Sequence, residues 1–276
     1  MSKRIRPSSI FVHILLAAMA FVFIYPLVWL FQSSLKTNTE IMTSPWTLPA
    51  VPQWDNYILA WTQANFPRLY WNSFFVTTIT LIIVLIVSSM AAYGVQRLKW
   101  KLSSSTMMFF LIGMMVPIHV VIIPLYFNFS RMGLINNYIS LILPYATFGL
   151  PSTILILSGF LSTIPRSLEE AAVIDGCTIP KAFLQIIIPI AQPALLTVGI
   201  FNFIGTWNEL LVALIFIGNP GRFTLPIGLA QFVGMYSTNF APMLAATSLA
   251  VIPTIIVYSI FNTRIVDGIA AGAIKA

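Results

Sequence analysis

Residues 165–189 begin Pro165-Arg166-Ser167-Leu168-Glu169-Glu170-Ala171-Ala172-Val173-Ile174-Asp175-Gly176 and end Ile186-Ile187-Ile188-Pro189. Apolar stretches lie on both sides of this segment, yet it holds three of the seven acidic residues of the whole chain. A very apolar chain has little physical reason to keep a compact charged segment at a membrane surface unless something binds there. The segment, called here the 165–189 loop, is therefore predicted to be a docking site.

Local signals in the 165–189 loop predict two short helices joined by a turn. Ser167 followed by Glu170 has the spacing of a capping box, so the first helix should begin at Ser167. Gly176 stands where this helix must end, and glycine readily adopts the left-handed conformation common there. Thr178 is placed to cap a second helix, with Pro180 in its first turn, where a missing N–H group costs nothing.

Several residues of the first helix are candidates for contact with a docked molecule. Ala171 and Ala172 give a small-residue face that another backbone can approach closely. Glu170 is the strongest candidate, and its alternative role is the reciprocal cap on Ser167. Asp175 lies near a helix C-terminus, where a negative charge is unfavourable by about 0.3–1 kcal/mol. That cost suggests a partner for Asp175, whereas the alternative is a loop carboxylate that faces water.

The composition indicates an integral membrane protein. Hydrophobic residues make up 58% and charged residues 8% of the chain, against roughly 25% charged in soluble domains. The net charge of +7 does not indicate nucleic-acid binding, because the basic residues lie at the ends of apolar stretches rather than in patches. The single cysteine, Cys177, has no partner for an internal disulfide and does not indicate the redox compartment.

Stretches without charged residues predict an all-α fold with six transmembrane helices. A helix needs about 20 apolar residues to cross a hydrocarbon core of about 30 Å. The expected spans lie near residues 10–34, 72–95, 105–127, 138–162, 190–217 and 241–263. The domain organisation is then a short N-terminus (1–9), a membrane domain (10–263) that contains the 165–189 loop, and a tail (264–276). The first apolar stretch is longer than the 7–15 residues of a signal-peptide core, so it is expected to stay uncleaved.

The basic residues predict the orientation in the membrane. If both termini lie on one side, that side holds ten lysines and arginines and the other side holds four. The positive-inside rule then places both termini and the 165–189 loop in the cytoplasm.

The residues of this loop also resemble a known motif. The pattern is Glu170-Ala171-Ala172, three residues, Gly176, nine residues, Ile186, one residue, a branched aliphatic residue and Pro189. It is similar to the EAA loop of the permease subunits of binding-protein-dependent ABC importers. Two mild departures are Ile188, where that family usually has leucine, and Cys177, where it often has alanine.

Weaker stretches extend the resemblance over nearly the whole chain, and they are most similar to the carbohydrate group, the second permease of maltose-type importers. They are Ser44-Pro45-Trp46 to Trp54-Asp55-Asn56-Tyr57, Pro124-Leu125-Tyr126, Gly133-Leu134-Ile135, Trp207-Asn208-Glu209, Leu225-Pro226-Ile227-Gly228-Leu229 and the glycine- and alanine-rich segment 268–275. The resemblance implies a bacterial or archaeal cell-membrane protein that imports sugars and forms half of the translocation path.

The sequence has no P-loop, no HExxH, no CxxC and no Gly-x-Ser-x-Gly, so no enzymatic activity is expected. The resemblance implies that ATP and Mg²⁺ bind to a separate ATPase, with no cofactor in this chain. It implies two ATPase copies beneath two paralogous permeases, and an extracellular sugar-binding protein that delivers substrate to the loops near 36–66 and 218–240. Glu170, Ala171, Ala172, Asp175 and Gly176 would then couple this chain to the ATPase.

Polar residues within the spans are candidates for the sugar path. His119 lies in the third span between Pro117 and Pro124, and a buried imidazole should face the bundle interior or water. The fifth span carries a polar and aromatic group, Asn202, Trp207, Asn208 and Glu209. Sugars are bound by aromatic stacking and by amide and carboxylate hydrogen bonds. The alternatives are a structural histidine, polar contacts between helices, and an interfacial Trp207, with Glu209 paired to Arg222 or to external water.

Two other functions remain open from the sequence. An ABC permease for an amino acid, metal or phosphate shares the Glu170 motif but fits the Trp207 element and the C-terminal segment less well. A self-contained channel or secondary transporter needs no docking loop. Co-purification with an ATPase separates these readings.

Overall fold

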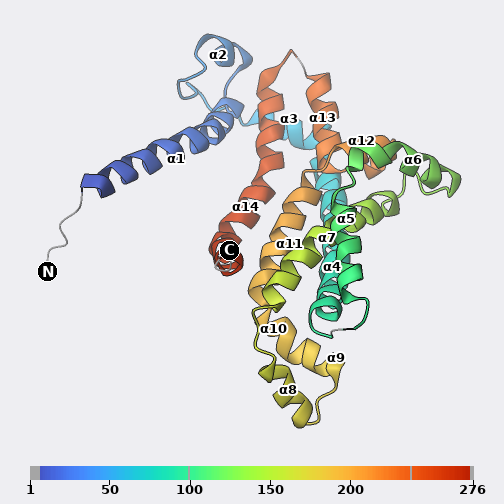
Figure 1. Ribbon diagram of the computed structural model, residues 1–276. Coiled ribbons are helices and arrows are strands. Elements are labelled where there is room, and N and C mark those ends of the chain that lie inside the picture. Colours follow the sequence, from blue (N-terminus) through green and yellow to red (C-terminus); the bar gives the residue numbers. More distant parts are fainter. Residues whose placement is uncertain (1–6, 99, 237, 274–276) are drawn as a thin grey trace. The chain divides into compact units, whose positions relative to one another are not determined.

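The computed structural model describes residues 7–98, 100–236 and 238–273. Within these ranges the chain is helical and contains no strand. Its elements in chain order (Figure 1) are α1 (Pro7–Ser34), α2 (Asn38–Thr43), α3 (Asp55–Gln63), α4 (Phe66–Gln96), α5 (Ser103–Met114), α6 (Ile118–Arg131), α7 (Ile139–Leu161), α8 (Ser167–Ile174), α9 (Ile179–Ala182), a π-helical turn (Phe183–Ile187), α10 (Ile188–Ile190), α11 (Gln192–Trp207), α12 (Leu211–Phe216), a 3₁₀ turn (Pro220–Arg222), α13 (Leu225–Met235) and α14 (Phe240–Ala273).

The described residues fall into two compact units, one made of 7–67 with 228–252 and the other of 68–227 with 253–273. In the first unit, Lys36 is fully buried. Its ammonium group donates to the carbonyl oxygens of Ser44 at 2.8 Å and Pro45 at 3.2 Å. Trp29 also donates to the Pro45 carbonyl, at 3.0 Å. Lys36 thus holds the chain after α2 against the end of α1, because a buried ammonium must be hydrogen-bonded.

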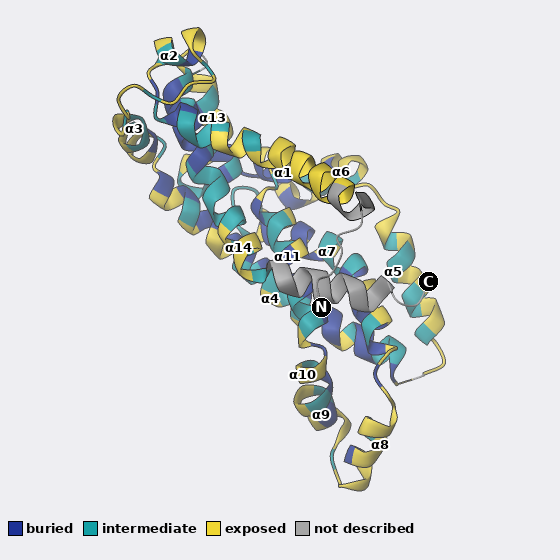
Figure 2. Ribbon diagram, turned by 90° about the vertical axis from the view of Figure 1, so that its left-hand side faces the viewer, coloured by how far each residue is buried: buried dark blue, intermediate teal, exposed yellow. Residues whose placement is uncertain are grey.

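The membrane-spanning character of the fold agrees with the prediction. Four helical segments are long and apolar enough to cross a bilayer: Phe11–Ser34, Phe66–Gln96, Ile139–Leu161 and Phe240–Phe261. Two bent helix pairs raise the number to six if each pair counts as one span. Figure 2 shows α1 exposed along almost its whole length. None of the apolar window of α1 is buried, so these side chains require lipid or another apolar surface around them.

The third and fifth spans are each a pair of helices that meet at a sharp bend. The α5–α6 pair bends by 93°, because Pro117 lacks an N–H group and has an extended backbone at ψ 132°. The fifth span bends by 75° at Ala191, between Pro189 and Pro193. The expected segment 190–217 is wrong at its far end, since α11 stops at Trp207 and the separate helix α12 follows.

The last helix runs beyond the expected sixth span. A segment long and apolar enough to cross a bilayer lies within Phe240–Phe261. The backbone stays helical through Ala273, so most of the expected tail 264–276 continues the helix. Residues 1–6 and 274–276, with the basic residues Lys3, Arg4, Arg6 and Lys275, lie outside the described residues.

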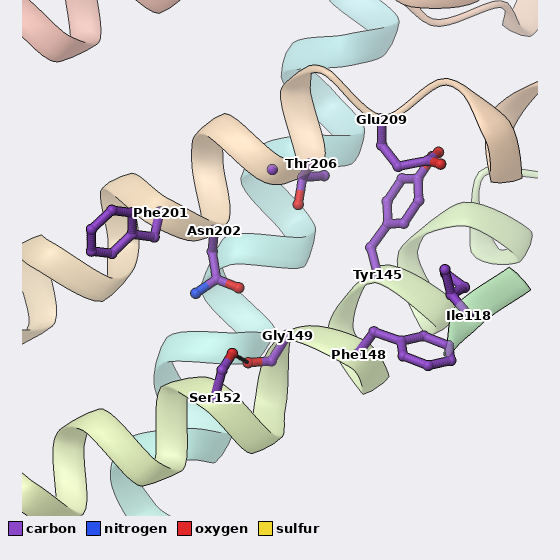
Figure 3. A pocket seen from close by; sticks show the side chains of 10 residues that line it. Ile118, Tyr145, Phe148, Gly149, Ser152, Phe201, Asn202, Thr206 and Glu209 are labelled. Carbon is purple, nitrogen blue, oxygen red and sulfur yellow. Dashed lines mark hydrogen bonds between the residues drawn. The ribbon is translucent and has the colours of Figure 1, made fainter. Parts of the chain in front are cut away.

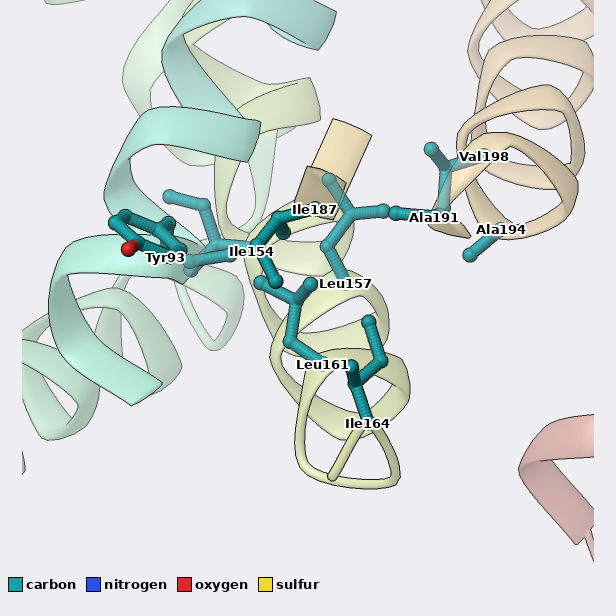
Figure 4. Packing of buried hydrophobic residues seen from close by; sticks show 10 residues of the cluster. Tyr93, Ile154, Leu157, Leu161, Ile164, Ile187, Ala191, Ala194 and Val198 are labelled. Carbon is teal, nitrogen blue, oxygen red and sulfur yellow. The ribbon is translucent and has the colours of Figure 1, made fainter. Parts of the chain in front are cut away.

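An apolar cluster in the second unit lies at the base of the 165–189 loop. Its members come from the end of α4, from α7, from the π-helical turn and from α11 (Figure 4). They are Ala92, Tyr93, Ile154, Leu157, Leu161, Ile164, Ile187, Ala191, Ala194 and Val198. Ile164 precedes the loop and Ile187 lies near its end, so both ends of the loop are anchored in one core.

Candidate functional site

The first helix of the 165–189 loop begins at the predicted residue but without the predicted cap. α8 starts at Ser167, yet Arg166 occupies the capping position and no side chain caps the helix. The capping box was therefore wrong. The physical reason is that Arg166 already has helical angles, φ −67° and ψ −27°, so Ser167 lies inside the helix rather than in the extended conformation that a cap requires. Glu170 consequently has no capping role.

Gly176 ends α8 as predicted. Its φ is +78°, in the left-handed region. The Cys177 N–H donates to the Ala172 carbonyl at 2.8 Å, and the Gly176 N–H donates to the Val173 carbonyl at 3.0 Å. This pair of bonds is the Schellman motif, which satisfies two carbonyls at the helix end. The sharp turn between α8 and α9 thus depends on a residue without a Cβ atom.

The second half of the loop follows the prediction at its start. Thr178 occupies the capping position of α9 with Pro180 in the first turn, although the Thr178 side chain makes no capping bond. Residues Phe183–Ile187 then form a π-helical turn, which the sequence did not reveal. Such turns are rare and are often found at functional sites. Here it lies immediately before the 75° bend at Ala191.

The tip of the loop is exposed. Glu170, Ala171, Asp175 and Gly176 are exposed, whereas Ala172 is buried at 7%. The two alanines therefore do not share one open face. Apolar side chains lie open beside the acidic ones, since Val173 is 57% and Ile174 85% exposed. An exposed helix end with carboxylates and large aliphatic side chains has the character of a protein-binding surface.

Sequence analysis missed the role of Arg97, which was used only to predict orientation. Its guanidinium pairs with the Glu169 carboxylate through two nitrogens, with Nε at 2.7 Å. This is the one ion pair found among the residues that the structure describes. The two residues are 72 positions apart, so no local pattern links them. The only sequence signal is an arginine at the end of one span and a carboxylate at the start of a loop helix.

A second candidate site is a pocket of about 250 Å³ in the second unit (Figure 3). It lies between α7 and α11, next to the first residue of α6. Its lining residues are Ile118, Tyr145, Phe148, Gly149, Ser152, Phe201, Asn202, Gly205, Thr206 and Glu209. Aromatic rings and small polar groups thus face one cavity, as is usual for small-molecule sites.

Asn202 lines this pocket and also joins two helices. Its amide nitrogen donates to the Thr153 hydroxyl at 2.9 Å and to the Val198 carbonyl at 2.8 Å. Its amide oxygen faces Gly149, where an added Cβ would lie only 2.5 Å away. Both roles considered for Asn202, contact between helices and lining of a path, are therefore compatible with its position.

Glu209 lines the pocket but does not pair with Arg222. The Tyr145 hydroxyl donates to its carboxylate at 2.5 Å, and the backbone N–H groups of Val212 and Ala213 donate at 2.9 and 3.2 Å. A carboxylate at a helix N-terminus is stabilised by these otherwise unpaired donors. Glu209 thus stabilises the start of α12 from two residues before it, while Arg222 donates instead to the backbone carbonyl of Asn136.

The other predicted path residues do not line this pocket. Trp207 is 4% exposed and stacks on Phe203, with ring centroids 5.5 Å apart. Asn208 is exposed and donates to the Ile204 carbonyl of its own helix at 2.9 Å. His119 is exposed at the start of α6, just after the bend at Pro117, rather than in the middle of a span.

The two sites offer different groups to a bound molecule. Among the described residues, no group of three or more His, Cys, Asp and Glu side chains is placed to hold a metal ion. The polar atoms of the pocket belong to an amide, hydroxyls and one carboxylate, which are suited to a neutral polyhydroxylated ligand. The loop instead presents a surface that a folded partner can cover.

Comparisons with known proteins show the family to which the chain is similar. The model of the family described as "Binding-protein-dependent transport system inner membrane component" matches residues 86–270. The diacetylchitobiose uptake system permease protein NgcG of Streptomyces coelicolor is 33% identical over 265 residues, which cover 95% of this chain and 88% of that protein. The trehalose transport system permease protein SugB of Mycobacterium tuberculosis is 36% identical over 253 residues, which cover 91% and 92%.

A solved structure supports the fold. A chain in the crystal structure of a bacterial ABC transporter involved in the import of the acidic polysaccharide alginate superposes with a TM-score of 0.79 at 21% identity. The match covers 95% of this chain and 99% of that one.

Proposed function

The chain belongs to the family of binding-protein-dependent transport system inner membrane components, and from this premise we propose that it is a permease subunit of an ATP-driven importer of sugars. As a family member it is a multi-pass membrane transport subunit and not an enzyme. It works with a second permease, an ATPase and a substrate-binding protein. The sugar class is proposed because relatives over 90% of the chain are named for uptake of diacetylchitobiose and trehalose.

The finer assembly is part of the proposal. Two ATPase copies lie beneath this chain and one paralogous permease, and both termini of this chain are cytoplasmic. An extracellular sugar-binding protein docks on the loops near 36–66 and 218–240. The basis for the orientation is the excess of basic residues on the side of the 165–189 loop.

The observation that carries the proposal is the form of the 165–189 loop. Its tip exposes Glu170, Ala171 and Asp175, while both its ends are held in the apolar cluster. Ala172 and Gly176 fix its shape through the Schellman motif. A rigid base with an exposed charged tip is suited to insertion into a cleft of the ATPase, whose closure on ATP binding would then move the attached spans.

The coupling role of the loop is tested by graded substitutions of Gly176. An added Cβ meets no atom of this chain within 4 Å, so the strain within the chain comes from the φ of +78°. A left-handed conformation costs an ordinary residue about 1–2 kcal/mol, and least for asparagine. We expect Gly176→Val to lower ATP-driven uptake by roughly 5- to 30-fold and Gly176→Asn to retain most of it. Equal uptake by both variants would contradict the role of the turn.

The pocket is proposed as part of the sugar path. Tyr145, Phe148 and Phe201 offer aromatic surfaces, and Asn202 offers an amide beside them. Sugars bind to such mixtures because their C–H faces stack on rings while their hydroxyls exchange hydrogen bonds with polar groups. Glu209 lies at the same cavity but uses its carboxylate to hold Tyr145 and α12.

Sugar import is tested by reconstitution of the complete complex in proteoliposomes. Uptake of labelled di- and oligosaccharides should require both ATP and the loaded binding protein. Uptake that persists without ATP would instead indicate a self-contained channel or secondary transporter. ATP-dependent uptake of amino acids or phosphate, without uptake of any sugar, would identify a permease for another class of solute.

A further inference from the structure

Arg97 connects three segments that are far apart in the sequence. It directly follows α4, and its backbone N–H donates to the Tyr93 carbonyl at 2.9 Å. Its Nη1 atom donates to the carbonyl of Leu161, the last residue of α7, at 3.1 Å and to that of Ile164, three residues further along the chain, at 2.8 Å. Its other nitrogens bind Glu169 in the first turn of α8. One guanidinium therefore joins the ends of α4 and α7 to the start of α8.

The electrostatics of this site favour a positive charge at this position. The last carbonyls of α7 have no partner within the helix and carry the negative end of its dipole. Glu169 lies at the positive end of α8, where a carboxylate is stabilised. The Arg97 side chain is 3% exposed and that of Glu169 18%, so water screens the pair weakly. The planar fork of arginine meets these acceptors in several directions, which a lysine ammonium does not do in the same way.

The apolar contacts around Arg97 show what its hydrogen bonds add to the structure. The apolar cluster already holds Ile164 and Ile187 at the two ends of the loop (Figure 4). These apolar contacts hold the two ends of the loop in place. They do not set the direction of α8, because the hydrophobic effect is not directional. The hydrogen bonds of Arg97 fix the direction in which α8 leaves α7. The same α7 carries Tyr145, Phe148 and Gly149 in the pocket.

Resting on the proposed function, we propose that Arg97 is a positioning residue that couples α8 to α4 and α7 through Glu169. When the ATPase moves α8, the guanidinium transmits the displacement to the end of α7, and α7 moves the pocket wall. Without the link, α8 remains bound to the ATPase but turns on its apolar base. ATP hydrolysis then proceeds with less transport.

The test compares Arg97→Lys and Glu169→Gln, which cut the same link from opposite ends and leave the apolar cluster intact. Each is reconstituted with the second permease, the ATPase and the binding protein. The readouts are the yield of assembled complex, the stimulation of ATP hydrolysis by sugar-loaded binding protein, and the ATP hydrolysed per sugar imported. We expect normal assembly, and a fall in stimulation with a rise in ATP per sugar, each about fivefold or more, the lower end of typical coupling between sites.

Lys101→Gln is the matched control, because it removes an exposed positive charge four positions from Arg97. It should leave both ratios unchanged. The inference is overturned if both variants assemble and keep the wild-type ratios, or if both fail to assemble, which makes Arg97 a structural brace only. If only one of the two variants assembles, the inference is judged from that variant's stimulation of ATP hydrolysis and its ATP hydrolysed per sugar imported. Failure of the proposed function is separate, because the wild-type complex itself would then import no sugar with ATP.

Discussion

At the residue scale, Gly149 sets how closely α7 approaches α11. An added Cβ would lie 2.5 Å from the Asn202 Oδ1 atom and 3.3 Å from Val84 Cγ2. Asn202 cannot easily turn away, since its amide nitrogen is held by two hydrogen bonds. Overpacking of this kind costs about 1–3 kcal/mol. We therefore expect Gly149→Ala to lower the melting temperature of the purified complex.

The matched control for this prediction is Gly159→Ala in the same helix. Nothing lies within 4 Å of a Cβ at Gly159. Alanine favours a helix over glycine by up to about 1 kcal/mol, so the melting temperature should stay the same or rise. Equal destabilisation by the two substitutions would show that packing at Gly149 is not the cause.

Local roles were predictable from sequence only in part, since the capping box of Ser167 and Glu170 was wrong. Gly176 was identified because a helix end needs a left-handed residue, and its φ of +78° confirms this. Arg97 and Glu209 were not understood, because their partners lie 72 and 64 positions away. Arg222 was a plausible partner for Glu209 by charge alone. Tyr145 is recognised as the partner of Glu209 only from the packing of α7 against α11.

At the scale of single elements, α2 depends on the ionised form of Glu40. The backbone N–H of Thr37 at 2.9 Å and that of Ala50 at 3.2 Å donate to its carboxylate. These donors hold the pKa of the Glu40 carboxyl below its usual range. The bonds stabilise the segment above the pKa of the unfolded chain, and this contribution is lost as the pH falls through the lowered pKa of the folded protein.

The resulting prediction concerns hydrogen exchange in the segment 37–50. Its amide protection should decrease at acid pH, once rates are corrected for intrinsic exchange. Glu40→Gln should remove most of this pH dependence, because the amide does not titrate. A segment that loses protection equally in the variant and the wild type would refute the role of Glu40.

Some elements were predictable from sequence and others were not. Long charge-free stretches suffice to locate apolar helices, and the two short helices of the 165–189 loop follow from turn residues. The short helices α2, α3, α12 and α13 and the size of the 93° and 75° bends did not follow. Prolines are tolerated inside membrane helices when neighbours satisfy the freed carbonyls, and Pro124, Pro144 and Pro253 do lie within continuous helices. Pro117 instead ends one, and the sequence alone does not distinguish the two outcomes.

At the scale of the whole molecule, the proposed orientation makes a direct prediction about labelling. Ser44 and Lys101 are both exposed and are expected on opposite sides of the membrane. In a Cys177→Ser background, Ser44→Cys should react with an impermeant thiol reagent on intact cells. Lys101→Cys should react only after the cells are permeabilised. The reverse pattern would invert the topology and place the 165–189 loop outside.

The central claim is that the tip of the 165–189 loop binds the ATPase, and site-specific photo-cross-linking tests it most directly. A photoreactive side chain at Ala171, which is exposed on α8, should form an adduct with the ATPase subunit in the assembled complex. The same group at Met132, which is exposed at the end of α6 and is expected on the opposite side, should not. An ATP-hydrolysing complex that gives no ATPase adduct from position 171, or equal adducts from both positions, would contradict the account.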